Sequence, residues 1–120
     1  MNKRQRLKTR LKDLVYTFVK ERDEYTCQWC EKTVSHNNCQ ASHVVSVARD
    51  GRLAHDPLNI KVLCGTCHEK WGADTVAGQK WFQELFPERW EHIERERIAN
   101  LSKGRIPHSW FEDKIEEFKC

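Results

Sequence analysis

Cys64-Gly65-Thr66-Cys67-His68 is the stretch that decides the fold, and it follows an earlier pair, Cys27-Gln28-Trp29-Cys30, after an interval of 33 residues, 31–63. A C-x-x-C-H run alone is the attachment signature of c-type haem. Residues 1–20 contain no apolar segment long enough for an export signal, and Met1 is the only methionine that could serve as a distal haem ligand. The two pairs instead predict a single site of four thiolates, a donor set that selects zinc or iron.

The composition is typical of a folded chain of one domain. The 120 residues are 38% hydrophobic and 32% charged, and no apolar run approaches the ~20 residues that a membrane span requires. The missing export signal and the paired cysteines predict a reducing compartment, so we expect a cytoplasmic protein without membrane association. Cys39 and Cys120 are left over, and we expect a buried free thiol and a frayed terminal thiol.

The positive charge is concentrated at the amino terminus. The formal net charge is +3, but residues 1–12 carry six basic residues and no acid, which gives +6 there and −3 elsewhere. Such a block suits the phosphate backbone of a nucleic acid, although a basic run can also be a solvated helix face. The residues that we expect to contact nucleic acid from this arm are Lys3, Arg4, Arg6, Lys8 and Arg10.

Periodicity predicts an α+β fold with three parts. Residues 1–24 form a basic amphipathic helix over about 4–21, residues 25–73 a metal-bound core, and residues 74–120 a helical extension, all in one compact domain. In the core we expect strands over 40–47 and 59–63 and a short helix from 67 to 71, ended by Gly72. In the extension, apolar residues share one face over 77–86, Pro87 opens a second helix, and a last helix spans about 109–118.

Three polar residues lie between or directly beside the cysteine pairs and are candidates for a catalytic site: His43, Asn59 and His68. A closed four-cysteine site with Cys27, Cys30, Cys64 and Cys67 is structural, so a reaction must take place beside it. Hydrolysis of a phosphodiester needs an activated water and a cation that stabilises charge on the phosphate. His43 can accept the proton of the water, and His68 can bind a divalent cation next to the zinc site.

The order His43, Asn59, His68 resembles the HNH endonucleases of the ββα-metal superfamily. The matching stretches are 41–44 (ASHV), 56–59 (DPLN) and 63–68 (LCGTCH), and the resemblance covers residues 27–71. It implies a zinc-stapled ββα core, His43 as general base, Asn59 as a brace for the loop, and His68 as ligand of a catalytic Mg²⁺, Mn²⁺ or other divalent cation. Residues 81–82 (WF) and 86–89 (FPER) extend the resemblance to phage HNH proteins related to NinG (Rap) recombination endonucleases.

The resemblance implies DNA as the partner, with Arg49 or Arg52 gripping a phosphate, branched DNA as one candidate substrate, and the host cytoplasm as location if the chain is phage-encoded. A homodimer is left open. The sequence departs from the family at Ser42, where many HNH enzymes carry Asp or His as a second ligand of the catalytic cation. Asp56 or His55 could assist instead. The alternative from another class is a non-catalytic zinc-ribbon module that binds nucleic acid.

Overall fold

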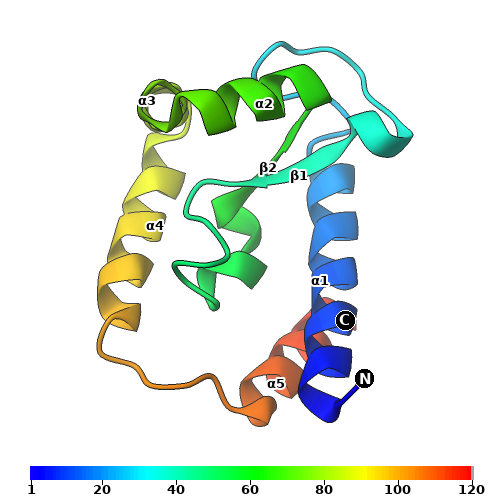
Figure 1. Cartoon of the computed structure of the whole chain (residues 1–120), viewed down its shortest axis with the longest axis vertical. Helices are drawn as coiled ribbons and strands as arrows, with labels where there is room; N and C mark the ends of the chain where they lie inside the picture. The colour runs from blue at the N-terminus through cyan, green and yellow to red at the C-terminus, as the bar shows by residue number, and fades with distance from the viewer. Residues whose placement is uncertain (120) are drawn as a thin grey trace.

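The computed structural model describes residues 1–119 of the 120-residue chain. Five α-helices surround a single two-stranded antiparallel sheet (Figure 1). The elements are α1 (Lys3–Arg22), the short 3-10 helix η1 (His36–Asn38), β1 (Gln40–His43), η2 (Leu53–His55), η3 (Pro57–Asn59), β2 (Ile60–Leu63), α2 (Gly65–Ala73), α3 (Thr75–Leu85), α4 (Pro87–Asn100) and α5 (His108–Lys119). The expected α+β class is confirmed.

The two strands and α2 form a ββα unit at the centre of the molecule. β1 pairs with β2 in a register that places Ser42 opposite Lys61 and His43 opposite Ile60. Every residue of β2 is buried, which is why its sequence reads as an almost continuous apolar run. α2 starts directly after β2, because the Cys64 side chain accepts a hydrogen bond from the Cys67 backbone N–H and thereby caps the helix.

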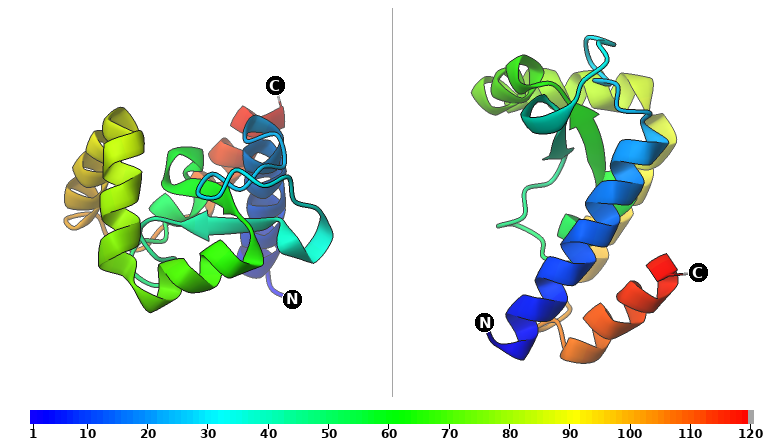
Figure 2. Two further views of the ribbon diagram at one scale, coloured as in Figure 1. Left: turned by 90° about the horizontal axis from the view of Figure 1, so that it is seen from above. Right: turned by 90° about the vertical axis from the view of Figure 1, so that its right-hand side faces the viewer.

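The long helix α1 packs along one side of this unit. Asn2 and Gln5 form a capping box, which satisfies free backbone donors at the start of the helix. Leu11, Val15 and Val19 are spaced by four residues and are fully buried, so one apolar stripe faces the strands while the basic residues face outward. α5 packs against α1. It starts beside the amino-terminal end of that helix, as the right view in Figure 2 shows, and its Phe118 reaches Phe18.

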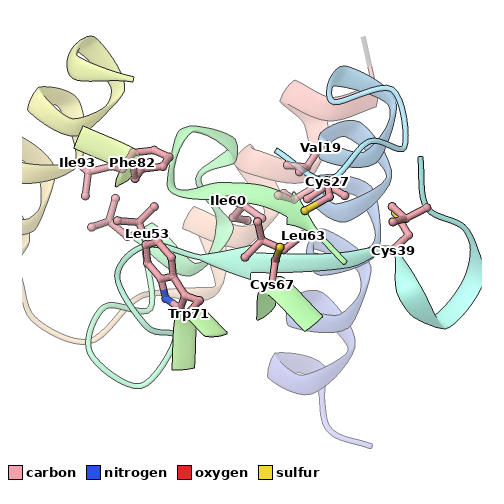
Figure 3. Close-up of a cluster of buried hydrophobic side chains, with 14 of the residues drawn as sticks. Val19, Cys27, Cys39, Leu53, Ile60, Leu63, Cys67, Trp71, Phe82 and Ile93 are labelled. Carbon is pink, nitrogen blue, oxygen red and sulfur yellow. The ribbon is translucent and has the colours of Figure 1, made fainter. Parts of the chain in front are cut away.

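Helices α3 and α4 cover the side of the sheet opposite α1. α3 packs on α2 and on α4, and α4 runs along the side of the hairpin remote from α1 (Figure 1). Figure 3 shows Phe82 and Ile93 meeting between these helices, and Trp71 and Cys67 pointing from α2 toward the sheet. The thiols of Cys27, Cys64 and Cys67 belong to the same buried cluster as these apolar side chains, so the cysteine site is part of the core.

Most expected elements are present, with different boundaries. β1 ends at His43 rather than at residue 47, because after the hydrogen bond from the Val44 N–H to the Asn59 carbonyl the Val45 backbone bonds to the side chain of Asn59 instead of to a strand. α2 begins at Gly65, two residues before the expected start. Cys39 is a buried free thiol as expected, and Cys120 lies outside the described residues. Within residues 1–119, helices of the length and apolar character needed to span a membrane are absent.

Candidate active site and metal centre

The four expected ligand cysteines converge. Their sulfur atoms all lie within 4.8 Å of one another, and the Sγ atoms of Cys30 and Cys64 are 3.8 Å apart. A tetrahedral zinc ion with Zn–S bonds of about 2.3 Å holds its sulfurs roughly 3.8 Å apart. The cluster of Cys27, Cys30, Cys64 and Cys67 is therefore arranged to bind a metal ion, and the geometry is consistent with structural zinc.

A tight turn presents the first cysteine pair. The backbone N–H of Cys27 donates to the Lys32 carbonyl at 2.8 Å, and that of Gln28 donates to the Val62 carbonyl of β2 at 2.9 Å. The Cys30 N–H points at the Cys27 sulfur at 3.5 Å. The turn is thus hydrogen-bonded to β2, the strand that leads into the second cysteine pair. A metal ion coordinated by all four sulfurs would link the two pairs directly.

The thiols of the cluster differ in how readily they lose a proton, because the pKa of Cys27 is lowered while those of Cys30 and Cys67 are raised. Burial raises the pKa of the Cys27 thiol, but backbone N–H groups at Cys30, Cys64 and Trp29 outweigh it and bring the pKa to about 7. Burial and the neighbouring thiols raise the pKa of Cys67. Because the thiolate is the metal-binding form, a cation at the centre of the cluster would offset the cost of charging the buried thiols.

His43 is held at the end of β1 by a backbone carbonyl. Its Nε2 lies 3.0 Å from the Ala54 carbonyl oxygen. A carbonyl can only accept, so Nε2 carries the hydrogen and Nδ1 is left as the proton acceptor of the neutral ring. Burial lowers the pKa of His43, the Ala54 carbonyl raises it in part, and the charges of Lys61 and nearby histidines lower it further. The imidazole is therefore neutral near pH 7, as a general base must be.

Asn59 braces the loop that carries this carbonyl. The residue is fully buried, and its Nδ2 donates to the carbonyls of Val45 at 3.0 Å and Leu53 at 2.9 Å. Its Oδ1 accepts from the Val45 N–H at 2.9 Å. Leu53 directly precedes Ala54, so these hydrogen bonds position the carbonyl that orients His43. The amide of Asn59 is thus hydrogen-bonded to backbone through both its oxygen and its nitrogen.

His68 lies in the first turn of α2, one residue after Cys67. Its Nδ1 is buried and has no hydrogen-bond partner among residues 1–119. Burial lowers the pKa of His68, and the charge of Lys61 adds to this while Glu69 opposes it. His68 is also close enough to His43 for its charge to lower the pKa of that base. The two imidazoles thus influence each other electrostatically, but His68 is not among the residues that line the cleft beside His43.

Lys61 is a site residue that sequence reasoning missed. Its side chain is fully buried in β2, its Nζ donates to the Ser42 hydroxyl at 2.9 Å, and the same Nζ lies 3.4 Å from the centroid of the Trp71 ring. Burial lowers the pKa of Lys61 well below its ordinary value. A lysine within the apolar run Ile60–Leu63 was the available signal, because buried lysines are rare unless they are paired.

A cleft of about 590 Å³ opens beside these residues. It is lined by residues of the strand end, the following loop and helices α2 to α4, among them His43, Arg49, Trp71 and Arg97. Arg97 forms an ion pair with Glu94 at 3.2 Å. The exposed Arg49 side chain makes no hydrogen bond or ion pair with any described residue, and so it is available to an anion entering the cleft.

Several other residues that the sequence assigned to DNA have partners inside the molecule. Arg4 donates to the Ile106 carbonyl at 2.7 Å, and Arg52 donates to the Gly104 carbonyl at 3.2 Å. Both therefore hold the segment that links α4 to α5, where their charges remain partly exposed.

The rest of the basic arm lies on the surface of α1. Lys3 is 3.9 Å from Glu112 of α5, and Arg6 donates to the Met1 carbonyl at 2.7 Å. Lys8 and Arg10 are exposed, and Lys8 lines a small cavity with Tyr16 and His55. These charges face solvent together on one helix.

The two residues expected to assist His68 point elsewhere. Asp56 is 2.7 Å from His92, a pair that lines a different cavity beneath α4 and α5. The Nδ1 of His55 lies 3.1 Å from the Gly51 carbonyl, and its ring meets Trp110 and Phe111 edge-on. Neither side chain shares a hydrogen bond with His68.

Comparison with known proteins identifies the central segment. Residues 27–74 match the family model described as HNH endonuclease. This segment contains the four cysteines, both strands, and α2, so the match supports the HNH superfamily for the ββα unit, with DNA as the corresponding substrate class. No curated protein and no solved structure matches the chain significantly.

Proposed function

We propose that the protein is an HNH endonuclease that hydrolyses phosphodiester bonds in DNA, since its central segment matches that family and carries a base of suitable geometry. The observation that carries the proposal is His43, which lines a cleft with Arg49 while its Nε2 is held at 3.0 Å by the Ala54 carbonyl. Holding one ring nitrogen leaves the other free to take a proton, which is the arrangement that general-base catalysis requires.

The chemistry follows from these residues. Nδ1 of His43 accepts a proton from a water molecule as that water attacks the phosphorus atom, a contribution typically worth ~10² to 10⁴ in rate. The bond from phosphorus to the opposite ester oxygen breaks, and this leaving oxygen takes a proton from solvent water. Arg49 binds a non-bridging phosphate oxygen and orients the linkage. Asn59 positions the base through the Leu53–Ala54 backbone. The cysteine cluster binds zinc, which supplies structural stability and takes no part in proton transfer.

The exposed basic side chains of α1 provide a second contact to DNA. Lys3, Arg6, Lys8 and Arg10 face solvent, and phosphate contacts of this kind position a duplex without reading its sequence. We therefore propose sequence-independent binding, in the cytoplasm. The predicted phage relationship, a branched substrate and a homodimer stay predictions.

A non-catalytic module that binds nucleic acid is the second candidate. Ser42 favours it, because a hydroxyl that accepts a hydrogen bond from Lys61 stands where many HNH enzymes carry a cation ligand. Such a module would bind DNA through the same basic surfaces and leave it intact.

A plasmid assay separates the two functions. The zinc-loaded protein is incubated with supercoiled DNA, with and without added Mg²⁺ or Mn²⁺, beside a His43→Ala variant, and the binding of a labelled duplex is measured in parallel. The proposal expects nicked or linear product from wild type alone and equal binding by both proteins. Fully supercoiled DNA in every lane, together with undiminished binding, would establish the module instead.

A further inference from the structure

The cation site that the HNH pattern implies has unusual surroundings in this chain. Two residues would be expected to hold a catalytic divalent cation, the one before the base and the histidine on the helix. Here these are Ser42 and His68. A serine hydroxyl is a poor ligand for Mg²⁺ or Mn²⁺, and a hard cation needs carboxylate oxygens to offset the loss of its hydration.

The space beside Ser42 is already filled. Lys61 stands opposite Ser42 in the strand register, its Nζ is 2.9 Å from the Ser42 oxygen, and the ring of Trp71 covers it at 3.4 Å. The side chain is fully buried. A divalent cation at this position would have to displace Nζ, and this holds whether the nitrogen carries three hydrogens or two.

Carboxylates that could hold a cation beside His68 are also engaged or exposed. Glu69, the next residue along α2, is exposed. Asp56, the carboxylate that the sequence offered as a helper, is paired to His92 at 2.7 Å. The site therefore presents the amine of Lys61 beside Ser42 where a metal-dependent site would present an acid.

We propose that Lys61 takes the place of the catalytic divalent cation, so that the site binds neither Mg²⁺ nor Mn²⁺ and DNA cleavage requires no divalent metal apart from the structural zinc. The cleavage half of this inference rests on the proposed nuclease function, whereas the binding half does not. Lys61 lies against Trp71, which lines the cleft. Its amine fills the position behind the cleft that the cation would occupy, and Arg49 makes the direct contact with the phosphate.

A metal-binding experiment tests the inference without reference to activity. Zinc-loaded wild type is titrated with Mn²⁺, and bound Mn²⁺ is measured by electron paramagnetic resonance. We expect no stoichiometric Mn²⁺ site in wild type. We expect one in the double variant Ser42→Asp/Lys61→Met, which restores a carboxylate and removes the amine, and its loss when His68→Ala is added. One Mn²⁺ bound per wild-type chain and released by His68→Ala would overturn the proposal.

Cleavage provides the second readout. The wild type is assayed on supercoiled plasmid in buffer freed of divalent ions over a chelating resin, which leaves the cysteine-bound zinc in place. We expect full activity there, and no increase in rate when Mg²⁺ or Mn²⁺ is added. Cleavage that appears only after Mg²⁺ or Mn²⁺ is added would overturn the proposal. If no condition gives cleavage, the nuclease function fails, and the Mn²⁺ titration of wild type still decides whether Lys61 excludes the cation.

Discussion

Replacing Asn59 with alanine should impair general-base catalysis by His43, although His43 itself is unchanged. The Asn59 amide makes three hydrogen bonds to the backbone, two to Val45 and one to Leu53, at 2.9 to 3.0 Å. Asn59→Ala leaves the partly buried N–H and carbonyl of Val45 without these partners, and the Leu53 carbonyl keeps only the Asp56 N–H as donor. The loop that presents the Ala54 carbonyl to His43 would then lose its support, so both stability and cleavage should fall.

The size of the effect follows from the number of lost bonds. Each hydrogen bond contributes about 1 kcal/mol, so loss of the three lowers the free energy of unfolding by about 3 kcal/mol. An unfolding entropy of about 2.1 cal/mol/K per residue gives a fall in Tm of roughly 12 °C for a chain of this length. Asn59→Asp should be at least as destabilising, because it places a carboxylate against two carbonyl oxygens.

Thermal unfolding followed by circular dichroism measures the change, with the zinc content held constant. The matched control is Asn37→Ala, since Asn37 is exposed and its side chain forms no hydrogen bond with the described part of the chain. The control should shift stability by less than about 0.5 kcal/mol. A loss below about 1 kcal/mol in Asn59→Ala, or an unchanged cleavage rate in the folded variant, would refute the positioning role.

Three further predictions concern the cleft, the base and the metal centre. A Cβ at Gly78 would lie 2.4 Å from the ring of Trp71, whereas one at Gly72 meets no atom within 4 Å. In urea unfolding, Gly78→Ala should therefore lower the free energy of unfolding by about 1–3 kcal/mol. Gly72→Ala should raise it by about 0.5–1 kcal/mol. Burial lowers the pKa of His43, and the base works unprotonated. The cleavage rate should therefore stay constant down to about pH 6.5 and fall only below it. A fall in cleavage rate with its midpoint above pH 7 would contradict this. Cys64→Ser should abolish the one-to-one zinc content measured by mass spectrometry and with it cooperative unfolding, and a variant that still unfolds cooperatively without zinc would show that the metal is dispensable.

Sequence patterns anticipated the elements whose signals are local. The helical spacing of Leu7, Leu11, Leu14, Val15 and Phe18 predicted α1, although Phe18 is exposed and Val19 is buried beside it. The C-x2-C pairs predicted the four converging sulfurs. The end of β1 was not predictable in this way, because it depends on the side chain of Asn59 bonding to Val45 across the loop. Local periodicity contains no information about such a contact.

Lys61 shows the same limit more clearly. A lysine is expected to face solvent, and only the register of the two strands reveals that it meets Ser42, while only the packing of α2 brings Trp71 over it. Arg4 and Arg52 differ from expectation for a similar reason. Their acceptors are carbonyls of the linker before α5, far away in the sequence.

The central claim is that His43 activates water for attack on DNA, and single-turnover cleavage tests it most directly. The rate constant for loss of supercoiled plasmid is measured with saturating zinc-loaded protein, for wild type and for His43→Ala at matched zinc content. Removal of a general base predicts a rate ~10² to 10⁴ lower in the variant with unchanged DNA affinity. Equal rate constants for the two proteins would contradict the account.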